Sequence, residues 1–400
     1  MTQPPAAVRT GLPRSVWALG WVSLCMDLSS EMVHSLLPLF LVGTLGASVM
    51  LLGILEGFAE GIAAVGKLFS GRLSDWMGRR KPLTVIGYGL AALSKPLFPL
   101  ADSIMLVFVA RFTDRIGKGI RGAPRDALIT DITPAAQRGA AFGLRQSLDS
   151  IGAVLGPALA VLLMLAWASD VRAVMWVACV PAAIAVAVLI AWVAEPVRVA
   201  AKSVTALPHW RDAKSFPRAF WWLVGIAALF TLARFSEAFL LLRAADLGLS
   251  AALAPVVLIV MSAVYAASAW PAGALADRVR PETVLIAGIT VLIAADLLLA
   301  LSTTVAAAMV GAALWGLHMG LTQGVFAKLV AAAAPAELRG TAFGFFHLIS
   351  AVALLGASVL AGGLWTRVGA AATFLTGAAL ALAALVLLTL TSRRRRSATV

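Results

Sequence analysis

Apolar residues along this chain form long runs that short polar segments interrupt. Twelve runs are long enough for a membrane-spanning helix, which needs about 20 mostly apolar residues. They cover residues 16–40, 48–70, 82–101, 104–128, 139–166, 172–194, 218–245, 250–273, 282–301, 304–331, 340–365 and 368–391. None shows the strict alternation of apolar and polar positions that a membrane barrel requires. The pattern predicts an all-α polytopic membrane protein with twelve transmembrane helices.

A polar stretch at 195–217 separates the first six predicted spans from the last six. It combines prolines with basic residues and has no apolar period, as expected of a linker. We therefore predict a six-helix bundle at 1–194, a cytoplasmic linker at 195–217, and a second six-helix bundle with a basic tail at 218–400.

The two predicted bundles carry related sequences. GRLSDWMGRRK at 71–81 returns in shortened form as GALADRVR at 273–280, and RGAAFGL at 138–144 returns as RGTAFGF at 339–345. Both separations are close to half the chain. Parallel repeats of this length in a polytopic chain are typical of transporters, so we expect the two bundles to be pseudo-symmetric.

Composition supports a membrane protein, since 61% of the 400 residues are hydrophobic and only 13% are charged. The net charge of +13 by itself suggests nucleic acid, but the basic residues lie mainly in alternate connecting segments. With a cytoplasmic amino terminus, nineteen fall in inside loops and about four in outside loops, namely Lys95, Arg172, Arg243 and Arg367. The positive-inside rule then places both termini in the cytoplasm, in a multi-pass protein of the cytoplasmic (inner) membrane. We expect membrane lipids as partners, and no nucleic acid.

One loop motif carries a resemblance to a known family. The segment after the second predicted span contains Gly71, Asp75, Gly78, Arg79 and Arg80, and the second half keeps Gly273, Asp277 and Arg278. With the twelve spans, these residues resemble the major facilitator superfamily. The resemblance implies a secondary transporter in which two halves rock about a midplane cavity.

Two further segments are similar to patterns of that family. RFTDRIGKG at 111–119 resembles its Arg-x-x-x-Gly-x-Gly-x-Gly motif, with Arg115 in place of the first glycine. In the fifth predicted span, Gly152, Gly156 and Pro157 resemble a helix-packing element of the family's antiporters, although the trailing glycine pair is absent.

The loop motif also has a direct physical interpretation. Asp75 can accept bonds from the amino-terminal amides of a neighbouring helix, and Arg79 and Arg80 can reach carboxylates nearby. Such contacts form a latch that breaks when the halves rock. The alternative is that Arg79, Arg80 and Lys81 only hold the loop inside the cell.

Charged residues within the predicted spans are candidates for proton coupling or substrate binding, because a charge at the bilayer centre costs about 3 kcal/mol or more. Asp27, Glu31 and His34 are spaced i, i+4, i+7 and share one helical face. The other candidates are Arg111, Asp114, Arg145, Asp149, Arg234 and Glu237. Asp27 and Glu31, near mid-span, are the best proton carriers, and Arg111 can pair with one of them or hold an anion. The alternative is that the acids and bases of neighbouring helices only neutralise one another and have no role in transport.

We predict a proton-coupled exporter (an antiporter) of an amphipathic organic compound, acting as a monomer on a small-molecule substrate and protons. No enzyme is expected, since the chain has no Gly-rich phosphate loop, and no cofactor or resident metal. Three alternatives within transport stay open. A divalent metal can be held by His34 with Asp27 and Glu31 on the same face, completed by His318 or His347. A small anion can be held by the basic residues of the fourth span, and uptake by symport is the third alternative. A non-transporting receptor or sensor is the alternative from another class.

Overall fold

The structure is a computed structural model that describes residues 12–77, 79–134, 137–195, 216–334 and 339–397. All regular structure in these residues is helical, which confirms that the fold is all-α. The helices are α1 (Arg14–Leu39), η1 (Phe40–Thr44), α2 (Val49–Met77), α3 (Lys81–Ser94), η2 (Lys95–Leu97), α4 (Ile104–Ile132), α5 (Arg138–Ala166), α6 (Val171–Trp192), α7 (Arg218–Ala233), α8 (Ala238–Asp246), α9 (Val256–Arg278), α10 (Pro281–Leu301), α11 (Val305–Ala333), α12 (Arg339–Arg367) and α13 (Ala370–Ser397).

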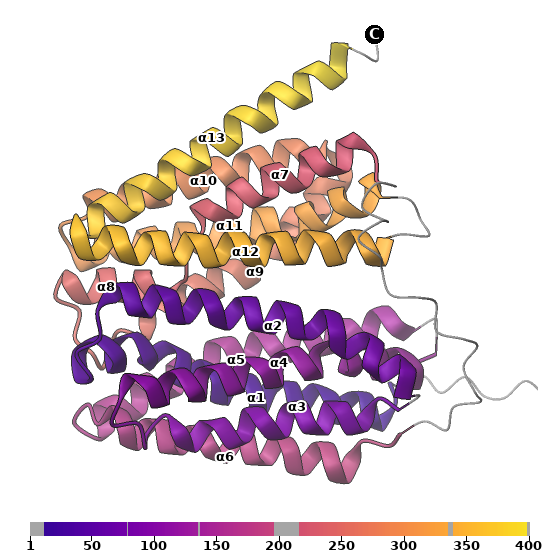
Figure 1. Cartoon of the computed structure of the whole chain (residues 1–400), viewed down its shortest axis with the longest axis vertical. Helices are drawn as coiled ribbons and strands as arrows, with labels where there is room; N and C mark the ends of the chain where they lie inside the picture. The colour runs from indigo at the N-terminus through magenta and orange to yellow at the C-terminus, as the bar shows by residue number, and fades with distance from the viewer. Residues whose placement is uncertain (1–11, 78, 135–136, 196–215, 335–338, 398–400) are drawn as a thin grey trace, which may run out of the picture.

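The helices form two groups, which Figure 1 shows one above the other. In the N-terminal half, α1 packs on α5 and α6, and α3 packs on α4. In the C-terminal half, α10 packs on α11 and α13. Helices α2 and α5 of the first half meet α12 and α9 of the second. The two halves therefore touch mainly along two helix pairs.

The molecule has two opposite ends, the linker end and the far end. At the linker end, the described chain stops at Glu195 and resumes at Phe216. At the far end, α1 joins α2 and α7–α8 joins α9 (at the left in Figure 1).

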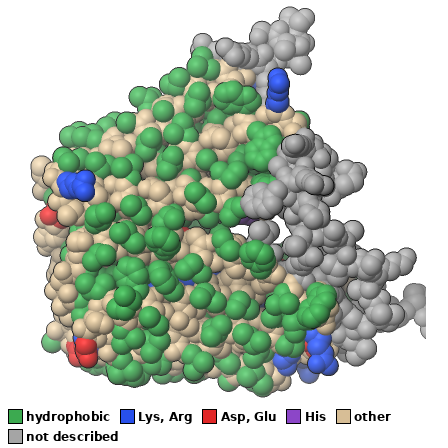
Figure 2. All heavy atoms as spheres, in the orientation of Figure 1, with side chains coloured by type: hydrophobic (Ala, Val, Ile, Leu, Met, Phe, Trp, Pro, Cys, Tyr) green, Lys and Arg blue, Asp and Glu red, His purple; other side chains and the backbone are tan. Residues whose placement is uncertain are grey.

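Ten stretches of the described residues are long and apolar enough to cross a membrane, with α7 and α8 together forming one of them. Figure 2 shows hydrophobic side chains over much of the face that it displays. Helices α3 and α4 are not among the ten. Helix α3 continues into the short η2 after 14 residues, and α4 carries charged residues along its length. The protein is thus a multi-pass membrane protein.

Polar side chains cap several helices at the far end. The side chains of Ser103, Asp170 and Thr304 accept hydrogen bonds from the third amides of α4, α6 and α11, at 3.0–3.3 Å. The first four amides of a helix have no partner within the helix, and each cap satisfies one of them. These caps help to fix the first residues of α4, α6 and α11.

Two sequence-based expectations differ from the structure. The predicted single span 218–245 is broken between Ala233 and Ala238, so that α7 and α8 are separate helices. The assignment of Lys95 to an outside loop is wrong, because this side chain is only 1% exposed. Its ammonium group lies 2.9 Å from Asp114 and 3.0 Å from Ser30, and this buried pairing explains why a basic residue occupies the interior.

The two halves pack tightly at the far end. One apolar cluster joins Leu52 and Leu55 of α2 with Ala238 and Leu242 of α8. Helices α2 and α12 approach so closely there that a Cβ atom on Gly53 would meet the backbone carbonyl of Ser358. Toward the linker end, Figure 2 shows a hollow between the halves. The structure is therefore closed at the far end and open toward the linker end.

Candidate functional site

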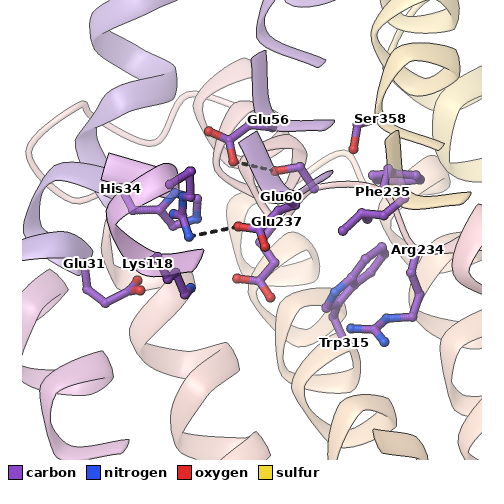
Figure 3. A pocket seen from close by; sticks show the side chains of 13 residues that line it. Glu31, His34, Glu56, Glu60, Lys118, Arg234, Phe235, Glu237, Trp315 and Ser358 are labelled. Atoms are coloured by element: carbon purple, nitrogen blue, oxygen red, sulfur yellow. Dashed lines mark hydrogen bonds and ion pairs between the residues drawn. The ribbon is translucent and has the colours of Figure 1, made fainter. Parts of the chain in front are cut away.

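A cavity of about 260 Å³ lies between the two halves. Figure 3 shows it from close by, with labelled side chains of both halves facing each other across it. Its wall consists of Glu31, His34, Glu56, Glu60, Arg115, Lys118, Arg234, Phe235, Ser236, Glu237, Trp315, Leu354 and Ser358. Eight of these thirteen residues are acidic, basic or histidine, so the cavity is strongly polar.

Helical periodicity builds the N-terminal side of the cavity. Three helices each contribute two side chains spaced three or four residues apart, which places both on one face. These pairs are Glu31 and His34 of α1, Glu56 and Glu60 of α2, and Arg115 and Lys118 of α4.

The interruption between α7 and α8 builds most of the C-terminal side. Arg234, Phe235, Ser236 and Glu237 all line the cavity, although four consecutive residues of a helix would point in different directions. The Ser236 hydroxyl accepts a hydrogen bond from the amide of Ala238 at 3.3 Å, which helps to start α8. Non-helical backbone at membrane depth is tolerated where it lines a cavity. The break therefore serves to present these side chains.

Several charged groups of the N-terminal half are already paired. Arg111, 1% exposed and directly behind the wall, donates to Glu56 at 2.8 Å, and its guanidinium lies 3.0 Å from Nδ1 of His34. Arg115 pairs with Glu60 at 2.9 Å. The Ser236 hydroxyl donates to Glu56 at 3.5 Å and so links the two halves. These pairs fix the wall of the cavity.

Four charged groups of the wall have no ion pair among the described residues: Glu31 and Lys118 in the N-terminal half, and Arg234 and Glu237 in the C-terminal half. The Nε atom of Arg234 also lacks a hydrogen bond, and its guanidinium lies 5.9 Å from the Phe230 ring centre. Buried charges are normally paired or bound to a ligand. The cavity thus offers two acids and two bases for protons or a solute.

The structure separates the other predicted site residues from this cavity. Asp114 forms the buried pair with Lys95. Arg145 bonds to Asp149 on the same helix and lies 3.9 Å from Asp126 of α4. Of the nine predicted coupling or substrate residues, Glu31, His34, Arg234 and Glu237 line the cavity and Arg111 lies behind it.

The predicted packing element occupies the contact between α5 and α1. A Cβ atom on Gly152 would lie 3.0 Å from the Cβ of Asp27, and one on Gly156 would lie 2.7 Å from the Cβ of Glu31. Pro157 follows inside α5 and is buried. These glycines therefore let α5 approach the helix that carries Glu31, while Asp27 faces α5 and is not part of the cavity wall.

Part of the predicted gating motif falls outside the described residues, namely all of Gly78, the surroundings of Gly71, and the side chains of Asp75 and Asp277. In the described part, Arg80 bonds to Ser74 and lies 3.4 Å from Asp131 of α4. The carboxylate of Glu195 accepts from the amides of Arg80 and Lys81 at 2.6 and 3.0 Å. Arg79, Gly273 and Arg278 are exposed. The motif thus connects helices of the N-terminal half with one another.

The histidines that were candidates for a metal site do not meet. His318 is fully buried in α11 against Phe230 and Trp315, and His347 packs beside Phe346. Neither lines the cavity with His34. Among the residues that the structure describes, no three His, Cys, Asp or Glu side chains are placed to hold a metal ion together.

Sequence reasoning missed several residues of interest. Glu56, Glu60 and Lys118 line the cavity but were not among the predicted site residues. The sequence shows the helical spacing of these residues, but it does not show which helix lies opposite them. Asp296 was also missed, although an isolated acid within a strongly apolar span is itself a signal of function.

The sequence matches the Major Facilitator Superfamily over residues 19–346 and 235–400. It is 30% identical over 377 residues to an uncharacterized MFS-type transporter of Methanocaldococcus jannaschii, and the match covers 93% of each chain. It is 31% identical over 129 residues to the multidrug resistance protein MdtH of Proteus mirabilis, covering 31% of each.

Two solved structures share the fold. The human organic anion transporter MFSD10 (TETRAN) has a TM-score of 0.68 at 19% identity, covering 96% of this chain and 100% of that one. A POT family transporter in complex with 5-aminolevulinic acid has a TM-score of 0.80 at 12% identity, covering 98% of both.

Proposed function

The chain belongs to the Major Facilitator Superfamily, and we propose that it exports a small solute bearing a cationic group in exchange for protons, by alternating access. The observation that carries this proposal is the cavity between the halves, where Glu31 and Glu237 have no ion-pair partner among the described residues. Exchange requires that solute and proton compete for the same site. A carboxylate without an ion-pair partner can bind either the cationic solute or a proton. Each half contributes one such carboxylate.

We place twelve spans in the membrane, six in each half, by adding α3 with η2 and α4 to the ten apolar stretches. An even number puts both termini on one side. Described basic residues of the linker end include Arg79, Lys81, Arg218, Arg278 and Arg280. The positive-inside rule therefore favours a cytoplasmic linker end. In this orientation the structure is open to the cytoplasm, and a monomer contains the complete cavity.

The size and polarity of the cavity favour a compact charged solute over the amphipathic compound expected from the sequence. Drug-sized ligands occupy pockets of about 300–1,000 Å³ with mostly apolar walls. This cavity measures about 260 Å³ and has charged side chains on both sides. Arg234 and Lys118 remain available for an anionic group on the same solute. The short match to MdtH supports export as the direction.

A second candidate is a small organic anion, which the free Nε of Arg234 favours. Protons and an anion would bind together rather than compete, because protonation of Glu237 removes a negative charge three residues from Arg234. The two candidates thus predict opposite effects of pH on solute binding. An exchanged cation binds less tightly as the pH falls, whereas an anion carried with protons binds more tightly.

Thermal unfolding of the purified protein with small amines, amino acids, carboxylates and phosphates tests the proposal. A solute at 100 times its dissociation constant stabilises the folded state by about 2.7 kcal/mol. We expect stabilisation by one cation-bearing class that weakens at low pH and is lost in Glu31→Gln and Glu237→Gln. Glu282→Gln is the control, because Glu282 lies at the start of α10, 3.9 Å from Arg280 and outside the cavity.

Proteoliposomes then test coupling. The stabilising solute, supplied on the linker side, should dissipate an imposed pH gradient in the wild type and not in Glu237→Gln. Solute flux that leaves the pH gradient unchanged would contradict proton exchange. Stabilisation by anions alone, stronger at low pH, would replace the first candidate with the second.

A further inference from the structure

Asp296 is a buried acid that lies outside the cavity. It lies toward the carboxyl end of α10, in the C-terminal half, and none of its surface is exposed. Neither carboxylate oxygen has a hydrogen-bond partner among the described residues, nor does the side chain make an ion pair there. An ionised carboxylate in such surroundings is very unfavourable, whereas the protonated acid is neutral.

The Asp296 carboxyl lies directly behind the break between α7 and α8. A Cβ atom on Gly377 of α13 would be 2.7 Å from Oδ2 of Asp296, 3.2 Å from the carbonyl oxygen of Ala233 and 3.2 Å from the Phe235 ring. These three groups therefore surround one point. Ala233 ends α7, so its carbonyl lacks the intrahelical partner that an uninterrupted helix would supply. A protonated Asp296 has a donor to offer in this region, and an ionised one has none.

The helices packed around α10 provide no charge that pairs with Asp296. Helix α11 carries His318, whose ring packs on Phe230 and Trp315, and the charged residues of α13, Arg393 to Arg396, stand at its carboxyl end, where the structure does not describe the side chains. The other titratable or charged side chains that the structure describes on neighbouring elements are Lys328 of α11, Tyr265 and Arg278 of α9, Arg218 of α7, Arg234 and Glu237 in the break, and Arg243 and Asp246 of α8; the side chain of Asp277 of α9 is outside the described part. None of them forms an ion pair with Asp296 in the described structure.

We propose that Asp296 is a proton-binding site, separate from the cavity, whose occupancy determines which end of the transporter is open. The proton adds to one carboxylate oxygen, and no other covalent bond changes. In the far-end-closed state, the site is dry and holds the neutral acid against the segment that presents Arg234, Ser236 and Glu237 to the cavity. Loss of the proton leaves a charge that this packing does not accommodate. It therefore favours a state in which the break has rearranged and water reaches the carboxylate.

The direction of the pH effect is set by linkage. The state that binds the additional proton is favoured at low pH, so the far-end-closed state loses population as the pH rises. This expectation is independent of the carried solute and goes beyond the proposed exchange, so it is measured without any solute.

Electron–electron distance measurements between spin labels at Asp102→Cys and Ser250→Cys test the proposal. Both positions are exposed at the far end, one in each half. The parent chain carries Cys25→Ala and Cys179→Ala and is reconstituted in lipid nanodiscs. We expect the long-distance population, in which the far end is open, to grow as the pH rises. In Asp296→Asn, which imitates the neutral acid, the short distance should persist at every pH.

Glu282→Gln is the matched control, because it neutralises another acid of α10, 3.9 Å from Arg280 and outside the cavity, and leaves Asp296 in place. It should keep a pH-dependent distance if Asp296 is the switch. If the distances in Asp296→Asn change with pH as they do in the parent, the proposal is wrong. If that variant does not fold, infrared spectra of the parent and of Asp296→Glu decide. A protonated carboxyl band that shifts on this substitution supports the site, and the absence of such a shift refutes it.

Discussion

The contact between α2 and α12 at the far end predicts how a single methyl group changes the conformational equilibrium. A Cβ atom on Gly362 would lie 2.8 Å from both the Cα of Met50 and the carbonyl oxygen of Val49. Both neighbours are backbone atoms, so no flexible side chain can move aside. Gly362→Ala must therefore push the two halves apart where the structure is closed.

The size of this effect is set by the cost of overpacking. An added methyl group in a tight contact costs about 1–3 kcal/mol. The cost applies only to the far-end-closed state, because the halves separate there when the far end opens. We therefore expect the ratio of closed to open molecules to fall by about 5-fold to about 150-fold.

The neighbouring residue provides the control. A Cβ atom on Gly363 would meet nothing within 4 Å, so Gly363→Ala adds the same methyl group to the same helix without a clash. Both substitutions gain the intrinsic helix preference of alanine over glycine, about 1 kcal/mol, which cancels in the comparison. The Asp102→Cys and Ser250→Cys label pair reports the populations. Equal distance distributions in the two variants would show that this contact does not hold the far end closed.

Three further predictions concern the packing. Asp114→Leu alone should destabilise the protein by about 3–5 kcal/mol in denaturant unfolding, since it leaves the buried Lys95 ammonium without an ion pair. Lys95→Met alone should cost less, because Asp114 keeps Arg115 at 3.7 Å, and adding Lys95→Met to Asp114→Leu should recover most of the loss. Gly156→Ala should abolish solute-induced stabilisation, because the added methyl group pushes α5 away from the helix that carries Glu31. Gly225→Ala is the control and should retain the stabilisation, because a Cβ atom at Gly225 meets nothing within 4 Å. Arg243→Leu should destabilise the protein by about 1.5–3 kcal/mol in the same unfolding assay, because charged hydrogen bonds to two carbonyls at the end of α10 are lost; an unchanged midpoint would contradict this.

The helical fold could be predicted from the sequence because a spanning helix leaves a long apolar run in the chain. The α7–α8 break could not, since a continuous helix with a charged face also accommodates Arg234, Ser236 and Glu237. Hydropathy reports how much of a segment is apolar and does not report where its backbone hydrogen bonds stop. Only the backbone of the structure shows that α7 ends at Ala233 and that α8 begins at Ala238.

The cavity was predicted only in part, for a related reason. Spacing by three or four residues shows which side chains share a face, as Glu31 and His34 do. It does not show which face of another helix lies opposite. The contact of Arg111 with Glu56, and the burial of Lys95 beside Asp114, depend on such tertiary pairing.

The unpaired charges of the cavity also predict that the proposed exchange is obligatory. Alternating access requires an intermediate closed at both ends, in which water is largely excluded from the cavity. A charge buried there without a partner costs several kcal/mol. Glu31 and Glu237 are half-buried and have no ion-pair partner in the described structure, so closure of the empty cavity would bury both charges unpaired. A proton or a cationic solute removes the charge penalty, whereas the empty carboxylates retain it. The same acids would thus bind the solute, bind the proton and prevent the unloaded halves from rocking, without a separate gate for each step.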